Sequence, residues 1–450
     1  MSVFGFLKKD GEKKKSSYLT GREIKEIAKA NQKEMRRLEK EKRRPKLEEE
    51  YLSEMKGENN ILEIENLHSY FFTDQGVVKA VNGVSFSIPL NSTVGVVGES
   101  GCGKSVTSMS VMRLLQGPSG QIVDGAIRFK AYDFKRDKDG NHIPVYETDE
   151  FGNVVYEPVL DKNGAPVLDK QGNPTQKPKQ KTDEFGLGIF EKEEKIFDVA
   201  KMPIDEMYRL RGRQMAMVFQ EPMTSLNPVF TIGDQLDEVT LLHVPNATKE
   251  LAKNRSVEML NMVGISMPER VYASYPHELS GGMRQRVMIA MALLCNPRLI
   301  IADEPTTALD VTIQAQILDL LREIKDKISG SIMLITHDLG VVAEMADFVV
   351  VMYAGKVIEM GTAEDIFDRP MHPYTIGLQK SKPSVDSEVE SLYCIPGFVP
   401  NPVDMPNYCY FRDRCEMCRK ECAGEYPHLI KVSDTHSVAC YLYKDEKKSD

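Results

Sequence analysis

The chain has 450 residues, more than one compact domain usually holds, so we expect a core domain with attached segments. It is 41% apolar and 28% charged, which excludes collagen-like and wholly disordered proteins. The net charge is −9, but residues 1–56 carry 17 Lys and Arg against 11 Asp and Glu, so a basic arm precedes an acidic body. The longest apolar run, residues 287–295, is too short to cross a membrane, and the N-terminus has no secretory pattern. We therefore expect a cytoplasmic protein whose eight cysteines are thiols or metal ligands.

Residues 1–58 are predicted to form a charged N-terminal extension. Helix formers dominate between Glu23 and Arg44, and Glu39 and Arg43 have the i, i+4 spacing that supports an exposed helix. The apolar stripe of this segment is thin. A solvated helix is therefore favoured over a membrane-surface or RNA-binding role.

A phosphate-binding loop is the clearest signal in the chain. The apolar run at residues 94–97 leads directly into GESGCGKS at residues 98–105, and a helical pattern follows. This is the G-x-x-x-x-G-K-S motif in its required place between a strand and a helix. Lys104 is expected to reach the β- and γ-phosphates and Ser105 to bind Mg²⁺. The backbone N–H groups that would cradle the phosphates belong to Gly98, Glu99, Ser100, Gly101, Cys102 and Gly103.

Two carboxylates follow a second apolar run. Residues 299–302 predict a buried strand that ends in Asp303 and Glu304. Ligands of open α/β sheets bind at the carboxyl ends of strands, so Asp303 is expected to hold Mg²⁺ and Glu304 to act as general base. The alternative is a helix cap or a surface pair.

A second anion site is predicted where Ser280, Gly281 and Gly282 open another helix. Two anion sites with the metal ligands for only one nucleotide suggest that two chains share their nucleotides. The alternative is an ordinary serine N-cap before a core helix.

The motifs GESGCGKS, VFQEPMTSLNP, LSGGMRQR, LIIADEP, ALD and THD occur in this order and resemble the ATP-binding subunits of ABC transporters, most closely the dipeptide and oligopeptide permease ATPases. The resemblance implies an α/β, doubly wound P-loop ATPase core over residues 59–362. This core would have a β-rich subdomain and a helical signature subdomain at residues 225–296. Residues 363–450 would then form the C-terminal, cysteine-rich extension of the oligopeptide permease type.

Roles of single residues follow from the same resemblance. Gln220 would sense the γ-phosphate and Mg²⁺. Ser280 and Gly282 would contact the γ-phosphate on the other ATPase subunit, and residues 308–310 would touch across that dimer. His337 would clamp the γ-phosphate and the attacking water, and its position after an apolar run again predicts a strand's carboxyl end. The family's adenine-stacking aromatic has no clear counterpart in this sequence. Phe72 is the favoured candidate, and an ordinary core position is the alternative for this residue.

The resemblance also implies a function. The chain would hydrolyse ATP with Mg²⁺ to drive peptide import, lying peripherally on the cytoplasmic face of the membrane. Its partners would be two membrane-spanning permease subunits, a second and paralogous ATPase subunit and, indirectly, an extracytoplasmic peptide-binding protein, with no nucleic acid. The main alternative is a soluble ABC-type ATPase that acts on ribosomes or nucleic acid through its basic arm. A non-hydrolysing regulatory module is disfavoured because Glu304 and His337 are both present.

Residues 133–202 are an insertion, because Lys104 and Gln220 are farther apart than the resemblance leads us to expect. Asp-Gly and Asn-Gly pairs between short Val-rich runs predict small β-hairpins with type I′ turns, and residues 176–181 predict a disordered return. The pattern resembles calcium loops only superficially, because the bidentate Glu of such loops is missing. A surface excursion, with protein contact as a further option, is the favoured interpretation.

The C-terminal extension carries a cluster of cysteines. Cys409, Cys415, Cys422 and Cys440 have the spacing that resembles an iron–sulfur site of this family, and four thiolates suit a [4Fe–4S] cluster. Zinc is an alternative, since Cys418 completes a C-x-x-C pair, and a structural tail without metal is another.

Overall fold

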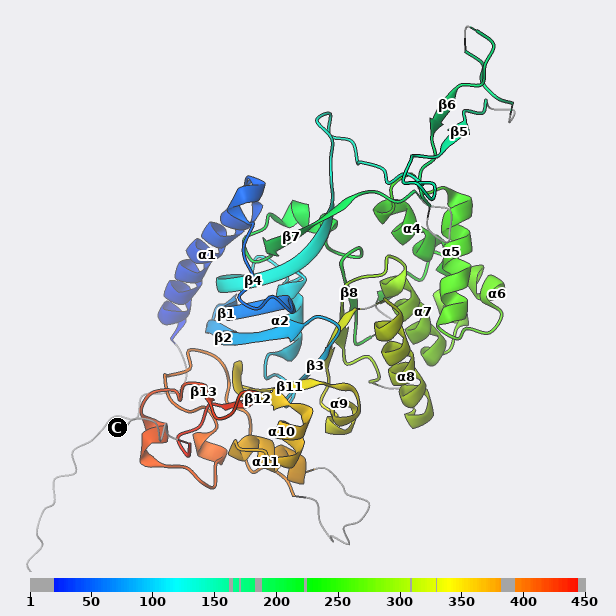
Figure 1. Cartoon of the computed structure of the whole chain (residues 1–450). Helices are drawn as coiled ribbons and strands as arrows, with labels where there is room; N and C mark the ends of the chain where they lie inside the picture. Colours follow the sequence, from blue (N-terminus) through cyan, green and yellow to red (C-terminus); the bar gives the residue numbers. More distant parts are fainter. Residues whose placement is uncertain are drawn as a thin grey trace, which may run out of the picture.

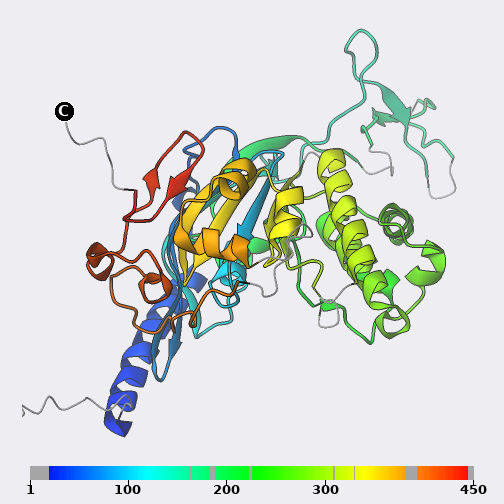
Figure 2. The same ribbon diagram turned by 90° about the horizontal axis from the view of Figure 1, so that it is seen from below.

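The computed structural model describes residues 20–161, 165–169, 171–182, 188–221, 225–307, 310–328, 330–381 and 393–443. They form two main sheets, a group of helices and a projecting arm (Figure 1). Seen from below, the group of helices lies on the opposite side of the molecule from the N-terminal helix (Figure 2). Within the described ranges, no helix is both long and apolar enough to cross a membrane.

The first sheet is antiparallel and has the order β2-β1-β4-β7. Its strands are β1 (Asn60–Thr73), β2 (Gly76–Pro89), β4 (Gly120–Phe134) and β7 (Lys192–Asp198). Strands β1 and β2 form a hairpin that ends in the pair Thr73 and Gly76. In the chain, β1 and β2 precede the phosphate loop, and β4 and β7 follow it.

Helix α1 (Gly21–Arg43) packs along this sheet and is not simply solvated. Leu38 is buried, and Asn31 Nδ2 donates to the carbonyl oxygens of Thr73 (2.6 Å) and Gly76 (3.4 Å). This contact is not predictable from the sequence, because a buried Asn interrupts the thin apolar stripe. The 3₁₀ turn Glu48–Glu50 leads from α1 to the sheet.

The second sheet has the order β13-β14-β12-β11-β3-β10-β9-β8. Its parallel strands are β3 (Thr93–Val97), β8 (Met215–Val218), β9 (Leu299–Asp303), β10 (Ser331–Ile335) and β11 (Phe348–Tyr353). Strands β12 (Lys356–Thr362), β14 (Ser437–Val438) and β13 (Ile430–Lys431) extend it in antiparallel fashion.

Both faces of the parallel strands are covered. In β10, Met333 and Ile335 belong to the core shared with the first sheet, whereas Ile332 and Leu334 belong to the core shared with helices. Such two-sided burial explains the continuous apolar runs in the sequence. The predicted α/β, doubly wound core is confirmed.

The helices form three groups. Helix α2 (Lys104–Val111) follows the phosphate loop. Helices α4 (Ile232–His243), α5 (Lys249–Met262), α6 (Pro268–Tyr272) and α7 (Gly281–Leu293) form the helical subdomain. Helices α8 (Val311–Ile328), α9 (Leu339–Met345), α10 (Ala363–Asp368) and α11 (Pro373–Lys380) cover the second sheet and lead into the C-terminal tail. Short 3₁₀ turns occupy Ile204–Arg209, Pro276–Glu278, Arg412–Arg414 and Lys420–Ala423.

An arm of hairpins projects from the ends of β4 and β7 (Figure 1). Its strands meet in threes, and backbone hydrogen bonds close a ring at each meeting. In one ring, Val145 donates to Ile189, Ile189 to Lys181, and Lys181 to Val145. The other rings join residues 135, 143 and 191, residues 147, 155 and 179, and residues 159, 167 and 175. Backbone pairing rather than a buried core therefore organises the arm.

The hairpin turns of the arm differ from the predicted type I′. Asp149 Oδ1 accepts from the backbone N–H groups of Phe151 and Asn153, and Gly152 alone has a positive φ of 83°. One left-handed glycine is typical of a three-residue loop with a bulge, whereas type I′ needs two. The Asp side chain favours this loop because it fixes the first residues of the turn.

The predicted disordered return is also wrong. Strand β6 (Gln176–Pro178) pairs with β5 (Tyr156–Pro158), and Lys177 lies opposite Glu157 at the centre of this pairing. Residues 162–164, 170 and 183–187 of the insertion lie outside the described part.

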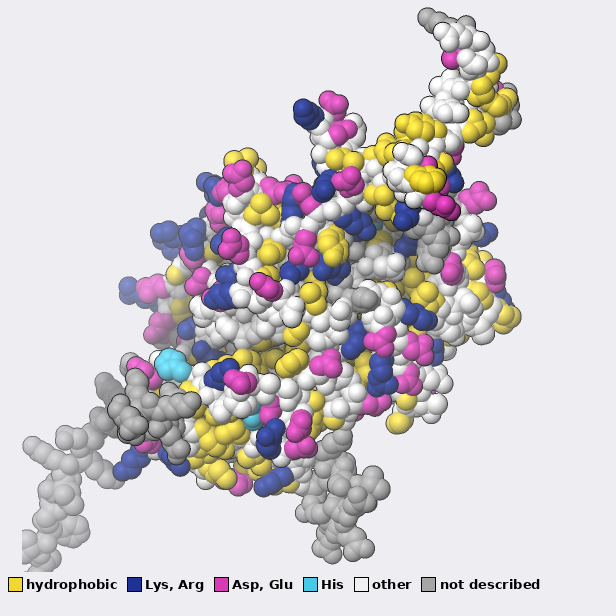
Figure 3. All heavy atoms as spheres, in the orientation of Figure 1, with side chains coloured by type: hydrophobic (Ala, Val, Ile, Leu, Met, Phe, Trp, Pro, Cys, Tyr) yellow, Lys and Arg dark blue, Asp and Glu magenta, His cyan; other side chains and the backbone are white. Residues whose placement is uncertain are grey.

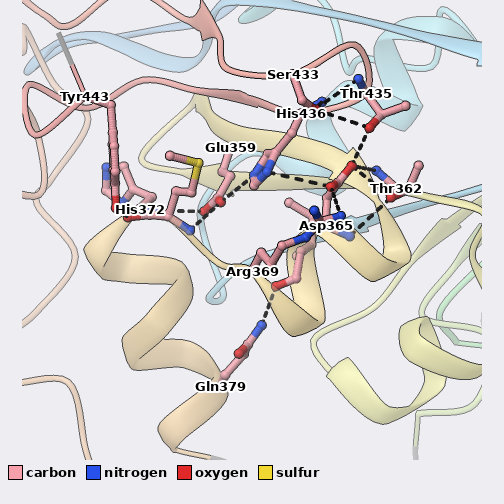
Figure 4. Close-up of polar contacts among 12 residues, drawn as sticks. Glu359, Thr362, Asp365, Arg369, His372, Gln379, Ser433, Thr435, His436 and Tyr443 are labelled. Atoms are coloured by element: carbon pink, nitrogen blue, oxygen red, sulfur yellow. Dashed lines mark hydrogen bonds and ion pairs between the residues drawn. The ribbon is translucent and has the colours of Figure 1, made fainter.

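The C-terminal tail docks on β12 through buried charges (Figure 4). Glu359, which is fully buried, accepts hydrogen bonds from His436 Nε2 (2.8 Å) and from the backbone N–H groups of Met371 and His372. Asp365 accepts from Thr435 Oγ1 at 2.6 Å. These contacts join three segments that are far apart in sequence.

Candidate functional site

The phosphate loop, residues 98–105, connects β3 to α2. Gly103 has φ of 102° and caps α2, and a Cβ there would lie 2.4 Å from the carbonyl oxygen of Ala80. Only glycine fits such a position. Lys104 is buried, and its Nζ donates to the carbonyl oxygens of Gly98 (2.7 Å) and Glu99 (3.1 Å). The ammonium group is thus held inside the loop that opens α2.

The other loop residues differ in exposure. Ser100 and Gly101 are exposed, and Cys102 is buried. Burial raises the pKa of the Cys102 thiol, so this residue serves packing. The Glu99 carboxylate pairs with Arg414 of the C-terminal tail.

Asp303 lies beside the phosphate loop. Ser105 Oγ donates to Asp303 Oδ1 (3.0 Å), and Ser108 Oγ donates to Asp303 Oδ2 (3.3 Å). Burial raises the pKa of Asp303, and the two serine hydrogen bonds oppose that rise. A hydroxyl and a carboxylate at this distance are oxygen donors of the kind that Mg²⁺ prefers.

Glu304 is the centre of a polar group formed by three strand ends. Gln220 Nε2 donates to Glu304 Oε2 (2.8 Å), and His337 Nδ1 lies 3.3 Å from Glu304 Oε1. Gln220, Glu304 and His337 follow β8, β9 and β10, which are neighbours in the sheet. The structure therefore brings together three residues that are scattered through the sequence.

The backbone of Glu304 has a φ of 47°, which is uncommon for a residue other than glycine. Its N–H donates to the carbonyl oxygen of Ile335, and Thr307 Oγ1 donates to Glu304 Oε2 at 2.9 Å. Strain of this kind persists where the surroundings fix the conformation. Thr307 is not among the residues predicted from the sequence. Its position three residues after Glu304 is nevertheless compatible with a hydrogen bond between the two side chains.

Ser280 caps helix α7, and its Oγ accepts from the backbone N–H of Met283 at 3.3 Å. Ser280 and Gly281 are exposed, and Gly282 is half-buried against Ile313. Helix α7 lies in the helical group, away from α2 and the phosphate loop (Figure 1). The structure thus keeps the serine-glycine turn apart from the Lys104 and Glu304 group of the same chain.

Gln285 connects that turn to the segment that follows Glu304. It is buried in α7, and its Nε2 donates to the carbonyl oxygen of Pro305 (2.6 Å), directly after Glu304. Gln285 is not predicted as a functional residue from the sequence, because a polar residue in an apolar helix is equally consistent with an exposed position. Residues 308 and 309, expected to touch across a dimer, lie outside the described residues.

The aromatic residues considered for adenine stacking lie in β1. Phe72 is buried, and Tyr70 is half-buried with its hydroxyl 3.0 Å from Asn82 Oδ1. Burial of Phe72 favours the core alternative for that residue.

Four of the cysteines of the tail line one small cavity: Cys409, Cys415, Cys422 and Cys440. Burial raises the pKa of Cys409 to about 12 and that of Cys440 to about 11. Among the described residues, however, no three His, Cys, Asp or Glu side chains are arranged to hold a metal ion. The thiols share a cavity without forming a finished ligand group.

Comparisons with known proteins cover most of the chain. A family model described as "ABC transporter" matches residues 81–152 and 185–307, and a model described as "Oligopeptide/dipeptide transporter, C-terminal region" matches residues 358–422. The interval between the two parts of the first match falls in the arm.

The relatives include the oligopeptide transport ATP-binding protein AppD of Bacillus subtilis, 42% identical over 388 residues, which are 86% of this chain and 98% of the relative. The dipeptide transport ATP-binding protein DppD of the same organism is 43% identical over 382 residues, 85% of this chain and 94% of the relative. The oligopeptide transport ATP-binding protein OppD of Haemophilus influenzae is 42% identical over 384 residues, 85% of this chain and 98% of the relative.

Proposed function

The chain belongs to the ATP-binding subunits of the oligopeptide and dipeptide ABC transporters, and from this premise we propose which of its residues bind and hydrolyse ATP. It is the ATP-hydrolysing subunit of an ABC importer for oligopeptides or dipeptides. The soluble ATPase acting on ribosomes or nucleic acid is not favoured.

ATP binds where the phosphate loop meets the carboxyl ends of β8, β9 and β10. We call this region, with Lys104, Gln220, Asp303, Glu304 and His337, the phosphate-loop edge. The backbone N–H groups of residues 98–105 and the Lys104 ammonium surround the β- and γ-phosphates. Ser105, Asp303 and Gln220 supply oxygen ligands for Mg²⁺, which when bound neutralises phosphate charge. The observed Ser105 to Asp303 hydrogen bond supports this assignment, because the metal's two main ligands already face one another.

Glu304 is the general base that orients the attacking water and receives its proton. His337 and Gln220 hold the Glu304 carboxylate in place and meet the γ-phosphate side of the site. The observation that carries this assignment is the meeting of Gln220, Glu304 and His337 within 3.3 Å at three neighbouring strand ends. Lys104 stabilises the charge that develops on the transferred phosphoryl group.

ATP turnover by the assembled transporter tests these roles. Glu304→Gln is expected to lower kcat by roughly 100-fold or more, because the amide cannot accept the proton. Glu344→Gln on α9 is the matched control, since Glu344 is exposed and pairs only with Arg322 among the described contacts. Equal turnover by wild type and Glu304→Gln would contradict the assignment of the base.

We propose that two ATPase subunits share their nucleotides, and that the partner is a paralogous chain. The exposure of Ser280 and Gly281, and the distance of α7 from the phosphate loop in Figure 1, support a γ-phosphate contact in trans. The substitution Ser280→Arg should abolish ATP-driven pairing while leaving ATP binding to the isolated chain intact. Pairing that survives this substitution would contradict the proposal.

We propose further that the chain lies peripherally on the cytoplasmic face of the membrane. Its direct partners are two membrane-spanning permease subunits, and an extracytoplasmic peptide-binding protein acts through them. Purification of the tagged chain from membranes, with identification of companion chains by mass spectrometry, tests this. Recovery of ribosomal proteins or nucleic acid in place of permease subunits would contradict it.

The cysteine cavity is proposed to hold a [4Fe–4S] cluster. Four thiols around one cavity are donors of the kind that this group uses, although they are not arranged as a ligand group, and the raised pKa values of Cys409 and Cys440 mean that binding there must release protons. Iron and acid-labile sulfide measured on anaerobically purified protein test this. About four of each per chain are expected, and Cys415→Ser should lose them while Cys394→Ser keeps them. Zinc without sulfide, or no metal, would overturn the proposal.

A further inference from the structure

The C-terminal tail reaches the phosphate loop through one ion pair. Arg414 Nη1 donates to Glu99 Oε2 at 2.7 Å, and Arg414 Nη2 donates to Glu99 Oε1 at 3.0 Å. The Arg414 side chain is only 6% exposed and that of Glu99 is 29% exposed. Two parallel bonds between partly buried groups make a strong and directional contact.

All five N–H groups of Arg414 have partners. Besides the two bonds to Glu99, Nε donates to the carbonyl oxygen of Pro396 (2.8 Å), Nη2 to that of Ile395 (3.3 Å) and Nη1 to Tyr353 Oη (3.4 Å). A guanidinium has five donors in a fixed plane, and no other side chain can make this set. The geometry is therefore specific to arginine.

The backbone of Glu99 is held by the same part of the chain. Its N–H donates to Tyr374 Oη at 2.8 Å, and Tyr374 is fully buried in α11. Its carbonyl oxygen accepts from Lys104 Nζ. Any shift of Glu99 would therefore displace a backbone N–H of the loop and a group that positions Lys104.

We propose that Arg414 is a positioning residue for the phosphate loop, so that the C-terminal extension forms part of the ATP site. The inference rests on the proposed function, since it deepens the account of the same loop. In this proposal Arg414 does not itself bind phosphate. It acts through Glu99, whose side chain and N–H are anchored by the tail while its carbonyl faces Lys104.

The cysteine cavity is connected to this contact. Arg414 ends the 3₁₀ turn Arg412–Arg414, which separates Cys409 from Cys415. The N–H of Arg412 donates to the carbonyl oxygen of Cys409, and the N–H of Cys409 donates to that of Cys422. Because Cys415 is the next residue after Arg414, a change in the state of the four thiols moves the turn that carries the guanidinium. ATP affinity should therefore depend on the integrity of the cysteine cavity.

A double-mutant cycle on ATP affinity tests the role of Arg414. Arg414→Gln and Glu99→Gln are each expected to raise the Kd for ATP of the full-length chain by roughly tenfold or more, the size of a lost hydrogen bond to a charged group. The double variant should bind no more weakly than either single one. Arg414→Lys should not restore affinity, because it keeps the charge and loses the paired bonds. Lys431→Gln, in an exposed pair with Asp434 of the same tail, is the control.

The kinetic pattern separates positioning from a general loss of structure. At saturating ATP, kcat of Arg414→Gln in the assembled transporter is expected to stay within about twofold of wild type, while KM rises with Kd. Should Arg414→Gln fail to fold, Glu99→Gln leaves the sequence of the tail unchanged and tests the pair from the other side. ATP binding of Arg414→Gln equal to wild type, or fully additive effects in the double variant, would overturn the inference.

The cysteine connection has its own test. Cys415→Ser is expected to raise the Kd for ATP in the same direction as Arg414→Gln, whereas Cys394→Ser, which lies outside the cavity, should not. Unchanged affinity in Cys415→Ser would overturn the connection. If wild type itself bound no ATP, the proposed function would fail, which is a distinct outcome from normal binding by Arg414→Gln.

Discussion

The phosphate-loop edge and the inserted arm are built on different physical principles. At the edge, buried charged side chains have their own hydrogen-bond partners: Lys104 donates to the carbonyl oxygen of Gly98, and Asp303 accepts from Ser105 Oγ, so each contact needs a particular residue type. In the arm, rings of backbone hydrogen bonds organise the chain, and side chains such as Phe151 and Leu168 are largely exposed. Figure 3 shows apolar side chains along the surface of the arm.

Single substitutions are therefore expected to have different effects in the two regions. A buried charge that loses its partner is costly, whereas a backbone ring survives most side-chain changes. We therefore expect large effects at the edge and in the tail that supports it, and small effects in the arm.

The largest effect is expected for Lys104→Ala. ATP turnover of the assembled transporter should fall roughly 10²–10³-fold, because a preorganised positive group is removed from the developing charge. Lys135→Ala at the base of the arm is the control, since Lys135 is exposed and pairs with Glu191. A decrease in ATP turnover of similar size in both variants would contradict the expected difference between the phosphate-loop edge and the arm.

Removing Glu359 should destabilise the fold. Glu359→Ala leaves His436 Nε2 and two backbone N–H groups without their acceptor, so we expect a loss of about 3–5 kcal/mol in the free energy of unfolding. Denaturant unfolding measures this, and Asp434→Ala, in an exposed pair with Lys431, is the control. A loss under about 1 kcal/mol would mean that the tail is held by other contacts.

His372 should make stability depend on pH. Full burial lowers its pKa to about 3, and its Nδ1 accepts from the backbone N–H of Tyr374, so the folded state keeps it neutral. The unfolded chain takes up a proton below about pH 6.5, hence stability is present above that pH and is lost as pH falls toward 3.

The slope from this one group is up to about 1.4 kcal/mol per pH unit. His372→Asn keeps a side-chain acceptor for the helix cap and cannot titrate, so its unfolding free energy should fall less steeply below pH 6.5. Equal slopes in the two proteins would contradict the assigned pKa.

The smallest effect is expected for loss of the arm. Strands β4 and β7 pair as far as Phe134 and Lys192, and the N–H of Lys135 still donates to the carbonyl oxygen of Glu191, so Lys135 can be joined to Glu191 by Asn-Gly in place of residues 136–190. ATP turnover should remain within about twofold of wild type. A tenfold loss would mean that the arm contributes to the ATP site.

The sequence predicts the edge well because its signals are local. The phosphate loop, the strand before Asp303 and the strand before His337 each combine a motif with an apolar run, and the sheet brings their ends together. The hairpins of the arm are predicted for the same reason, although the turn type and the pairing of Gln176–Pro178 are not.

Long-range support cannot be predicted in this way. Arg414 lies 315 residues from Glu99 in the sequence. An Arg next to a Cys is as compatible with a solvated surface charge as with a buried ion pair. Asn31 of α1 and Gln285 of α7 are polar residues whose partners are backbone carbonyls of distant segments. Such partners carry no sequence signal, since every residue has a carbonyl group.

Hydrogen–deuterium exchange of the Glu304→Gln chain, with and without Mg²⁺ and ATP, tests the account most directly. We predict slower exchange at residues 98–105 and 411–416 when ATP is added, and unchanged exchange at residues 137–161. Protection in the arm, or none at the phosphate loop, would contradict the account.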